Sequence, residues 1–250
     1  MWRHGWSRPG TWSCPSTIGG GGESEGIPNR LIPLEQVEDA RSALTFLQLQ
    51  PDVDPRRIGL YGLSFGGGIV TYAAAMDSRV ACTVAVSGPA SGRRWMEALR
   101  TTWQMQAFEE RLRQEAEQRG RTGEFTYVDP LEFMDCDPDF KTAWRGFQEG
   151  DPRMARRITF DSAQAMMDFR PELVAHLISP RPIMWIHGAR EKLIPVDEAI
   201  ANYRQAGEPK KLVIFPDYDH LDLDVEPGLF QQMDLAIDWF DRELKASSLT

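Results

Sequence analysis

Residues 57–68 read Arg-Ile-Gly-Leu-Tyr-Gly-Leu-Ser-Phe-Gly-Gly-Gly, and this stretch decides the fold that the sequence predicts. Ile58, Leu60 and Tyr61 favour a buried strand, because aliphatic and aromatic side chains are enriched in strands. Residues 67–75 continue as Gly-Gly-Ile-Val-Thr-Tyr-Ala-Ala-Ala, which predicts a helix directly after it. The stretch therefore predicts a strand, a very tight turn and a helix, with Ser64 at the turn.

Ser64 lies between Gly62 and Gly66 in a G-x-S-x-G pattern. A serine at the tip of a strand-to-helix turn needs strained backbone angles, and small neighbours let the strand and the helix pass closely. Its hydroxyl then projects above a helix N-terminus, whose amides attract negative charge. The alternative is a glycine-rich turn with a solvated serine. We predict that Ser64 is a nucleophile.

The composition excludes several classes of function. The chain has 250 residues, which is enough for one α/β domain with an insertion or for two small domains. A net charge of −9 argues against a nucleic-acid partner, because phosphate binding needs a basic face. No apolar run approaches the ~18 residues of a membrane-spanning helix. Residues 1–16 also lack the apolar core of a signal peptide.

The cysteines bear on compartment and metal binding. Cys14, Cys82 and Cys136 have no metal-site spacing and do not pair evenly, which fits a reducing compartment. We therefore expect a cytoplasmic protein. We expect no metal, no organic cofactor, no nucleic-acid partner and no membrane partner.

Strands alternate with helices in two parts of the chain, residues 27–89 and 178–250. Apolar runs predict further buried strands over 79–87, 182–187 and 211–215, and amphipathic patterns predict helices over 33–48, 196–206 and 229–244. Continuous apolar strands are typical of a parallel sheet that is covered on both faces. The alternation predicts an open α/β sheet that binds its ligand at the carboxyl ends of the strands.

Residues 90–177 interrupt this alternation. They are rich in Met, Trp and Phe, and the pattern predicts one long helix over 93–119 followed by short helices. We interpret residues 90–177 as a helical cap inserted into the α/β core, and residues 1–26, which lack periodicity, as an irregular N-terminal arm. Large apolar side chains of the cap either pack against the core or contact the substrate. As substrate contacts we predict Trp95, Met96, Trp103, Phe108 and Phe169.

A serine nucleophile needs a base within hydrogen-bond reach. His220 follows the strand at 211–215 by a short loop, at the sheet edge where Ser64 lies, and we predict that it is the base. His4 lies in the irregular arm, His176 precedes a strand in a helix-like stretch, and His187 ends that strand, where it supports the turn.

The base in turn needs a carboxylate that orients it. Glu191 lies in the loop after the strand at 182–187, and we predict that it is the acid. Asp197 is the alternative, although an acidic residue in the first turn of a helix is accounted for by the helix dipole. Glu191 could also be an exposed residue that pairs with Arg190 or Lys192.

The chain order Ser64, Glu191, His220 is the order of nucleophile, acid and base in α/β-hydrolases. From about Gly20 to Leu244 the sequence resembles this superfamily, in particular the dienelactone-hydrolase-like and acyl-peptidase-like serine hydrolases with a helical cap. The stretches that carry the resemblance are residues 22–26, 53–67, 179–188 and 219–220.

The resemblance implies a mostly parallel open sheet and a serine esterase that forms an acyl-enzyme. It also implies that the Phe65 amide stabilises the oxyanion. The sequence departs from the family pattern by having glutamate, Glu191, where the acid is usually aspartate. A second departure is that Ser64 lies too near the first residue for the strands and the helix that the family places before the nucleophile.

We therefore expect the N-terminal strands to be reduced or missing. The second oxyanion donor then has no clear counterpart, since His4-Gly5-Trp6 resembles the family segment but lies too close to Gly20. An uncovered strand beside Ser64 also favours pairing, so a homodimer that covers it is one expectation.

The expected function is hydrolysis of a carboxylic ester with a small or medium acyl group. A thioesterase or a carbon–carbon bond hydrolase using the same three residues is one alternative. A truncated, non-catalytic hydrolase-like binding protein is the other.

Overall fold

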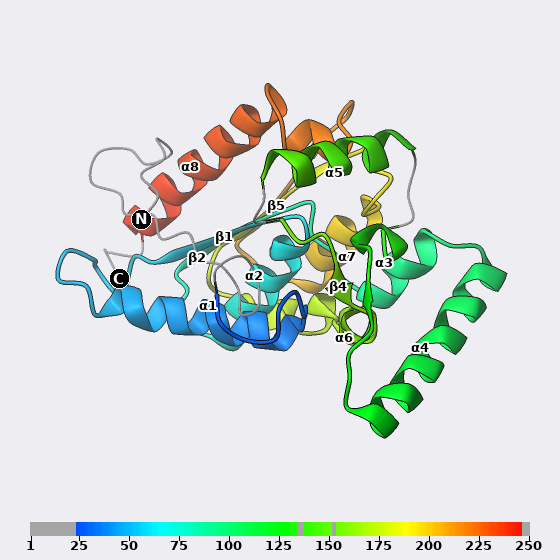
Figure 1. Cartoon of the computed structure of the whole chain (residues 1–250). Helices are drawn as coiled ribbons and strands as arrows, with labels where there is room; N and C mark the ends of the chain where they lie inside the picture. Colours follow the sequence, from blue (N-terminus) through cyan, green and yellow to red (C-terminus); the bar gives the residue numbers. More distant parts are fainter. Residues whose placement is uncertain (1–23, 135–137, 152–153, 247–250) are drawn as a thin grey trace.

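The computed structural model describes residues 24–134, 138–151 and 154–246. These residues form a parallel sheet with helices on both faces and a helical segment to one side (Figure 1). In the described part of the chain the sheet has four strands, and its neighbouring strands are all parallel. Their order is β1 (Gly59–Leu63), β2 (Cys82–Val86), β5 (Ile183–Gly188) and β6 (Lys210–Phe215). The predicted mostly parallel α/β sheet is confirmed.

Helices cover both faces of this sheet because its central strands are apolar on both sides. Every residue of β5 is buried, and its side chains alternate between two cores. Ile183 and Trp185 pack against the face covered by α1 (Pro33–Gln48), α2 (Phe65–Met76) and α7 (Asp197–Gln205). Met184 and Ile186 pack against the opposite face, where α8 (Gly228–Ala246) lies (Figure 1). Two-sided burial accounts for the continuous apolar pattern in the sequence.

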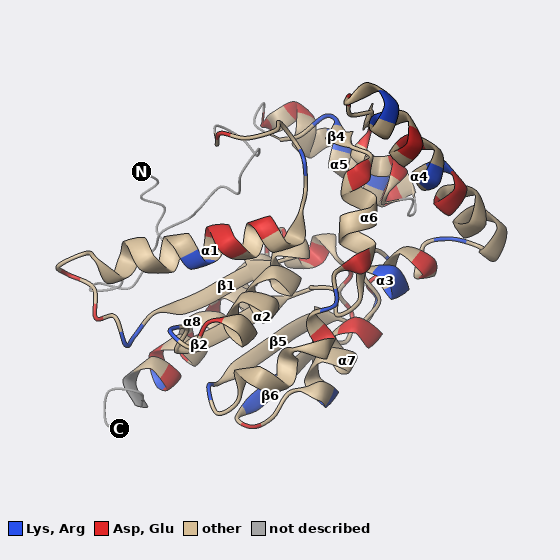
Figure 2. Cartoon of the chain, turned by 90° about the horizontal axis from the view of Figure 1, so that it is seen from below, with Lys and Arg blue, Asp and Glu red and all other residues tan. Residues whose placement is uncertain are grey.

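The helical segment, residues 92–168, lies between β2 and β5 in the chain. Its described residues, 92–134, 138–151 and 154–168, contain four helices and an antiparallel two-stranded ribbon. The elements are α3 (Gly92–Ala98), α4 (Thr102–Thr122), β3 (Tyr127–Val128), the 3-10 turn η1 (Pro130–Glu132), α5 (Pro138–Gly150), β4 (Ile158–Thr159) and α6 (Asp161–Asp168). Acidic and basic side chains are interspersed along α4 (Figure 2). The remaining 3-10 turns are η2 (Pro171–Leu173), η3 (Ala175–Ile178) and η4 (Leu221–Leu223).

The single long helix predicted over residues 93–119 was wrong. The chain leaves the helix at residues 99–101, because Thr101 caps a new one. Its hydroxyl accepts a hydrogen bond from the Gln104 amide, and the Gln104 side chain accepts one from the Thr101 amide. This reciprocal pair is a capping box, and Thr-x-x-Gln is its sequence signature. Arg100 closes the preceding helix by donating to the Met96 carbonyl at 3.1 Å.

Aromatic side chains make the core of the helical segment. The rings of Phe108, Phe133 and Phe160 meet edge to face, with centroids 5.5 to 6.2 Å apart. The same cluster includes Leu193 and Ile194, which belong to the loop after β5. The helical segment therefore packs directly on a loop of the sheet, close to a predicted site residue.

A buried carboxylate on α7, Glu198, binds the residues at the start of this segment. Glu198 is 1% exposed and accepts hydrogen bonds of 2.8 Å from the amides of Ala90 and Ser91. Arg94 on α3 also donates to it, at 2.6 Å from Nε, and reaches Glu172 at 2.9 Å from Nη1. A buried carboxylate with this many donors is fully satisfied, so residues 90–94 and 172 are fixed against the same helix.

Candidate active site

The turn between β1 and α2 has the strained geometry that the glycine pattern predicts. Ser64 has φ 55° and ψ −130°, which a residue other than glycine rarely adopts. A Cβ atom on Gly62 would lie 2.1 Å from the carbonyl oxygen of Gly66, so only glycine fits there. The Ser64 amide donates to the Val86 carbonyl at 2.8 Å, which fixes the turn to the end of β2. Ser64 is therefore held in a single position at the carboxyl edge of the sheet.

His220 lies in the loop after β6, at the same edge. Its Nε2 lies 3.0 Å from the Oγ of Ser64, and the residue is 5% exposed. The loop is shaped by Asp219, whose carboxylate accepts hydrogen bonds from the amides of Leu221 and Asp222. His220 is thus placed within hydrogen-bond reach of the predicted nucleophile.

Glu191 lies in the loop after β5 and is 7% exposed. Its Oε1 accepts a short hydrogen bond from the Nδ1 of His220. Its Oε2 lies 2.9 Å from the Nε2 of a second histidine, His187, the residue expected to support this turn. Asp197, the alternative acid, is exposed at the first turn of α7. The structure therefore brings Ser64, His220 and Glu191 into one chain of hydrogen bonds and leaves Asp197 outside it.

The ionisation of Glu191 and His220 is set by the attraction between these two buried side chains. Burial by itself raises the pKa of Glu191, but the charge of His220, its hydrogen bond and the nearby imidazole of His187 lower that pKa to about 2. Burial lowers the pKa of His220, and the Glu191 carboxylate outweighs it, so the pKa of His220 is raised. At neutral pH Glu191 is a carboxylate, and its charge stabilises the imidazolium that forms when His220 takes a proton from Ser64.

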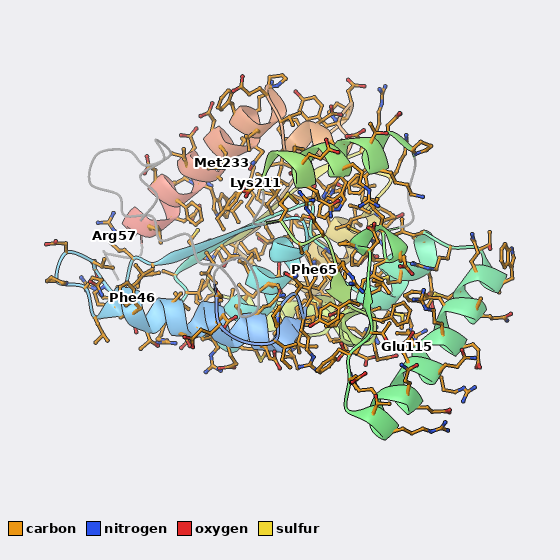
Figure 3. The ribbon with its side chains drawn as sticks, viewed as in Figure 1. Phe46, Arg57, Phe65, Glu115, Lys211 and Met233 are labelled. Carbon is orange, nitrogen blue, oxygen red and sulfur yellow. The ribbon has the colours of Figure 1, made fainter. Side chains whose placement is uncertain are left out.

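Phe65, the predicted oxyanion donor, is the first residue of α2. Its amide is one of the first-turn N–H groups for which an α-helix has no internal acceptor. Its ring packs between Trp95 and Phe169, with centroids 5.9 Å from each. Figure 3 shows Phe65 near the middle of the molecule, beside the helical segment. The second candidate segment for the oxyanion, residues 4–6, lies outside the described residues.

The five predicted substrate contacts occupy two environments. Four lie in buried clusters and one lies at the surface of α4. Their exposures are 2% for Trp95, 0% for Met96, 9% for Phe108, 4% for Phe169 and 68% for Trp103. Their role as substrate contacts stays a prediction.

Two residues beside the site were not among those predicted from the sequence. The ring of Phe140 on α5 is 5% exposed and meets the His220 imidazole edge to face, with centroids 6.2 Å apart. The sequence signal for Phe140 was Trp144, four residues later, because residues at this spacing lie on one face of a helix. The two rings stack on each other. Asp224, in the turn after His220, is the other. Burial raises the pKa of Asp224, although the nearby charge of His220 opposes this rise.

A cleft of about 490 Å³ lies elsewhere, between α4, α6 and residues 30–32. Its walls carry both acidic and basic side chains, including Arg119 and Asp161, which pair with each other. Neither Ser64 nor His220 lines it. The geometry around Ser64, rather than this cleft, defines the candidate site.

Metal-binding clusters and membrane-spanning helices are both absent from the described part of the chain. In residues 24–134, 138–151 and 154–246, no three His, Cys, Asp or Glu side chains gather as a metal ion would need. Within the same ranges, no helix has the length and apolar character to cross a membrane.

The comparison with known families agrees with this geometry. Residues 11–227 match the alpha/beta hydrolase fold family, and the chain belongs to that family. The fold and the ordered hydrogen-bond chain at the strand ends are what this family is built around.

Individual relatives cover most of the chain. An uncharacterized 31.7 kDa protein of Escherichia coli is 27% identical over 227 residues, covering 90% of this chain and 78% of the relative. Thiohydrolase aneE of Aspergillus aculeatus is 28% identical over 214 residues, covering 80% and 66%. Polyketide transferase grgF of a Penicillium species is 27% identical over 224 residues, covering 85% and 73%.

The crystal structure of the alpha/beta hydrolase GrgF from Penicillium superposes with a TM-score of 0.74. It is 22% identical in sequence and covers 91% of this chain and 78% of that chain. This likeness shows a shared fold.

Proposed function

We propose that the chain is a serine hydrolase that cleaves a carboxylic ester with a small or medium acyl group. The observation that supports this most is the continuous hydrogen-bond chain from Ser64 through His220 to Glu191, on a strained serine at the sheet edge. A hydroxyl, an imidazole and a carboxylate in this arrangement are the parts needed for acyl transfer. The family adds the expectation of hydrolase chemistry.

The proposed reaction has two halves. Ser64 Oγ attacks the ester carbonyl while His220 Nε2 takes its proton, and the Phe65 amide donates to the oxyanion. The tetrahedral intermediate collapses, the carbon–oxygen bond to the alcohol breaks, and His220 returns the proton to the leaving oxygen. Water then attacks the acyl-enzyme with His220 again as base, and the Ser64 oxygen leaves with the proton. Glu191 holds the imidazole and its charge throughout.

A thioester is the second candidate substrate, because the relatives aneE and grgF are named thiohydrolase and polyketide transferase. The same steps apply, with a thiolate as the leaving group. A thiolate leaves without the proton that an alkoxide needs, so thioester cleavage depends less on His220 as an acid.

A matched pair of substrates separates the two candidates. We expect a larger kcat/KM for phenyl butyrate than for S-phenyl thiobutyrate, although thiophenolate is the better leaving group. Both rates are followed by the release of the phenol or the thiol under the same conditions. A larger kcat/KM for the thioester would make the chain a thioesterase instead.

A further inference from the structure

Two buried ring N–H groups hold the loop that carries Glu191. We call residues 189–196, between β5 and α7, the acid loop. Trp95 Nε1 donates to the Leu193 carbonyl at 2.7 Å, and His187 Nε2 lies 2.8 Å from the Ile194 carbonyl. The two rings are 2% and 0% exposed. Consecutive carbonyls of the acid loop are thus bonded to rings from two different elements, α3 and β5.

The partners of His187 fix its tautomer. A carbonyl oxygen only accepts, so Nε2 of His187 carries the proton that faces Ile194. Its Nδ1 is buried and has no hydrogen-bond partner among the described residues. The same Nε2 lies 2.9 Å from Glu191 Oε2, while Oε1 binds His220. The two oxygens of the Glu191 carboxylate therefore lie beside two imidazoles, and Oε1 is the one that makes a hydrogen bond, to His220.

Trp95 connects the helical segment to both sides of the site. Its N–H is used by the acid loop, and its ring lies against the ring of Phe65, with centroids 5.9 Å apart. The preceding residue, Arg94, binds Glu198 on α7, which follows the acid loop. A shift of α3 would consequently move the acid loop and the residue next to Ser64 together.

We propose that Trp95 and His187 are positioning residues, which hold the acid loop so that Glu191 orients His220 toward Ser64. This proposal rests on the proposed function, since it concerns the same site. It gives Trp95 a role different from the substrate contact that the sequence predicted. A positioning residue affects kcat, whereas a substrate contact affects KM and the preference for acyl length.

The chain offers a matched control for Trp95. Trp185 on β5 is also buried, at 1% exposure, but its ring N–H has no partner among the described residues. Trp95→Phe and Trp185→Phe therefore remove the same atoms from equally buried rings, and only the first removes a hydrogen bond to the acid loop. His187→Gln keeps an N–H near the place of Nε2, and His187→Leu removes it.

The first readout is kinetic, with p-nitrophenyl acetate, butyrate and hexanoate. We expect Trp95→Phe and His187→Leu to lower kcat by up to about 10²-fold, the cost of small misplacements of reacting groups. KM and acyl preference should stay close to those of the wild type. Trp185→Phe should keep the wild-type kcat, and His187→Gln should recover much of the loss. A change confined to KM that varies with acyl length would overturn the proposal for Trp95.

The second readout does not need activity, so it separates this proposal from the proposed function. The proton on His220 Nδ1, bonded to Glu191, should give a far-downfield NMR resonance in the wild type and in Trp185→Phe. The resonance should be lost or shifted in Trp95→Phe and His187→Leu, in protein that circular dichroism shows to be folded. An unchanged resonance in both variants, or its absence from the wild type, would overturn the proposal even if esterase activity were present.

Discussion

Replacing Ser64 by alanine will lower kcat for p-nitrophenyl butyrate by on the order of 10⁶-fold, and His220→Ala will lower it by about as much. Both losses have one cause. The hydroxyl is reactive only while Nε2, 3.0 Å away, can take its proton. Because the two residues act as a unit, the double variant should be no slower than either single variant. Stopped assays at high enzyme concentration measure the residual rates.

His176→Ala is the control for this pair, because His176 is exposed in η3 and plays no part in the proposed mechanism. It should keep the wild-type kcat. Full activity in Ser64→Ala would show that another residue carries the reaction. Losses that multiply in the double variant would show that Ser64 and His220 work independently.

Glu191→Gln should lower kcat by on the order of 10⁴-fold, since an amide neither orients the imidazole correctly nor stabilises its charge. It should also shift the pH profile. The Glu191 carboxylate raises the pKa of His220 above its ordinary value of 6.5, so wild-type kcat/KM should rise with pH through a midpoint above 6.5. Without that carboxylate the largest remaining influence is burial, which lowers the pKa of His220 against the smaller opposing charges of Asp224 and Asp219, so the midpoint should move to lower pH.

Asp197→Asn provides the comparison, because Asp197 lies exposed on α7 outside the hydrogen-bond chain. It should change neither kcat nor the midpoint. Glu191 would not be the residue that orients His220 if Asp197→Asn produced the larger loss of kcat. The same would follow if Glu191→Gln left the midpoint of the pH profile unchanged. Steady-state kinetics from pH 5 to 9 in buffers of constant ionic strength would show which holds.

The features that the sequence predicts well are those with local causes. β5 is buried on both faces, so every residue from Ile183 to Gly188 is constrained to be apolar or small, apart from His187. The turn at Ser64 needs Gly62, where any side chain would strike the next turn. Parallel strands end at one edge of a sheet, so the apolar pattern alone suffices to group the residues in the loops after β1, β5 and β6.

The features that the sequence did not predict depend on contacts between distant segments. Trp95 and Trp103 look alike in an apolar pattern, yet Trp95 is buried against the acid loop and Trp103 is 68% exposed on α4. Phe140 reaches His220 only because α5 is folded back over the loop after β6. The break at residues 99–101 did have a local signal, the capping box of Thr101 and Gln104, which the apolar periodicity across it concealed.

Covalent labelling of the wild-type protein with a fluorophosphonate tests the central claim most directly. The proposed mechanism predicts one phosphonyl adduct on Ser64, within the tryptic peptide of residues 58–79. Tandem mass spectrometry would locate the adduct and distinguish Ser64 from Ser78 in that peptide. The adduct should be absent from Ser64→Ala and should form much more slowly in His220→Ala. No adduct on the folded wild-type protein, together with no ester turnover, would contradict the mechanism and favour a non-catalytic binding protein.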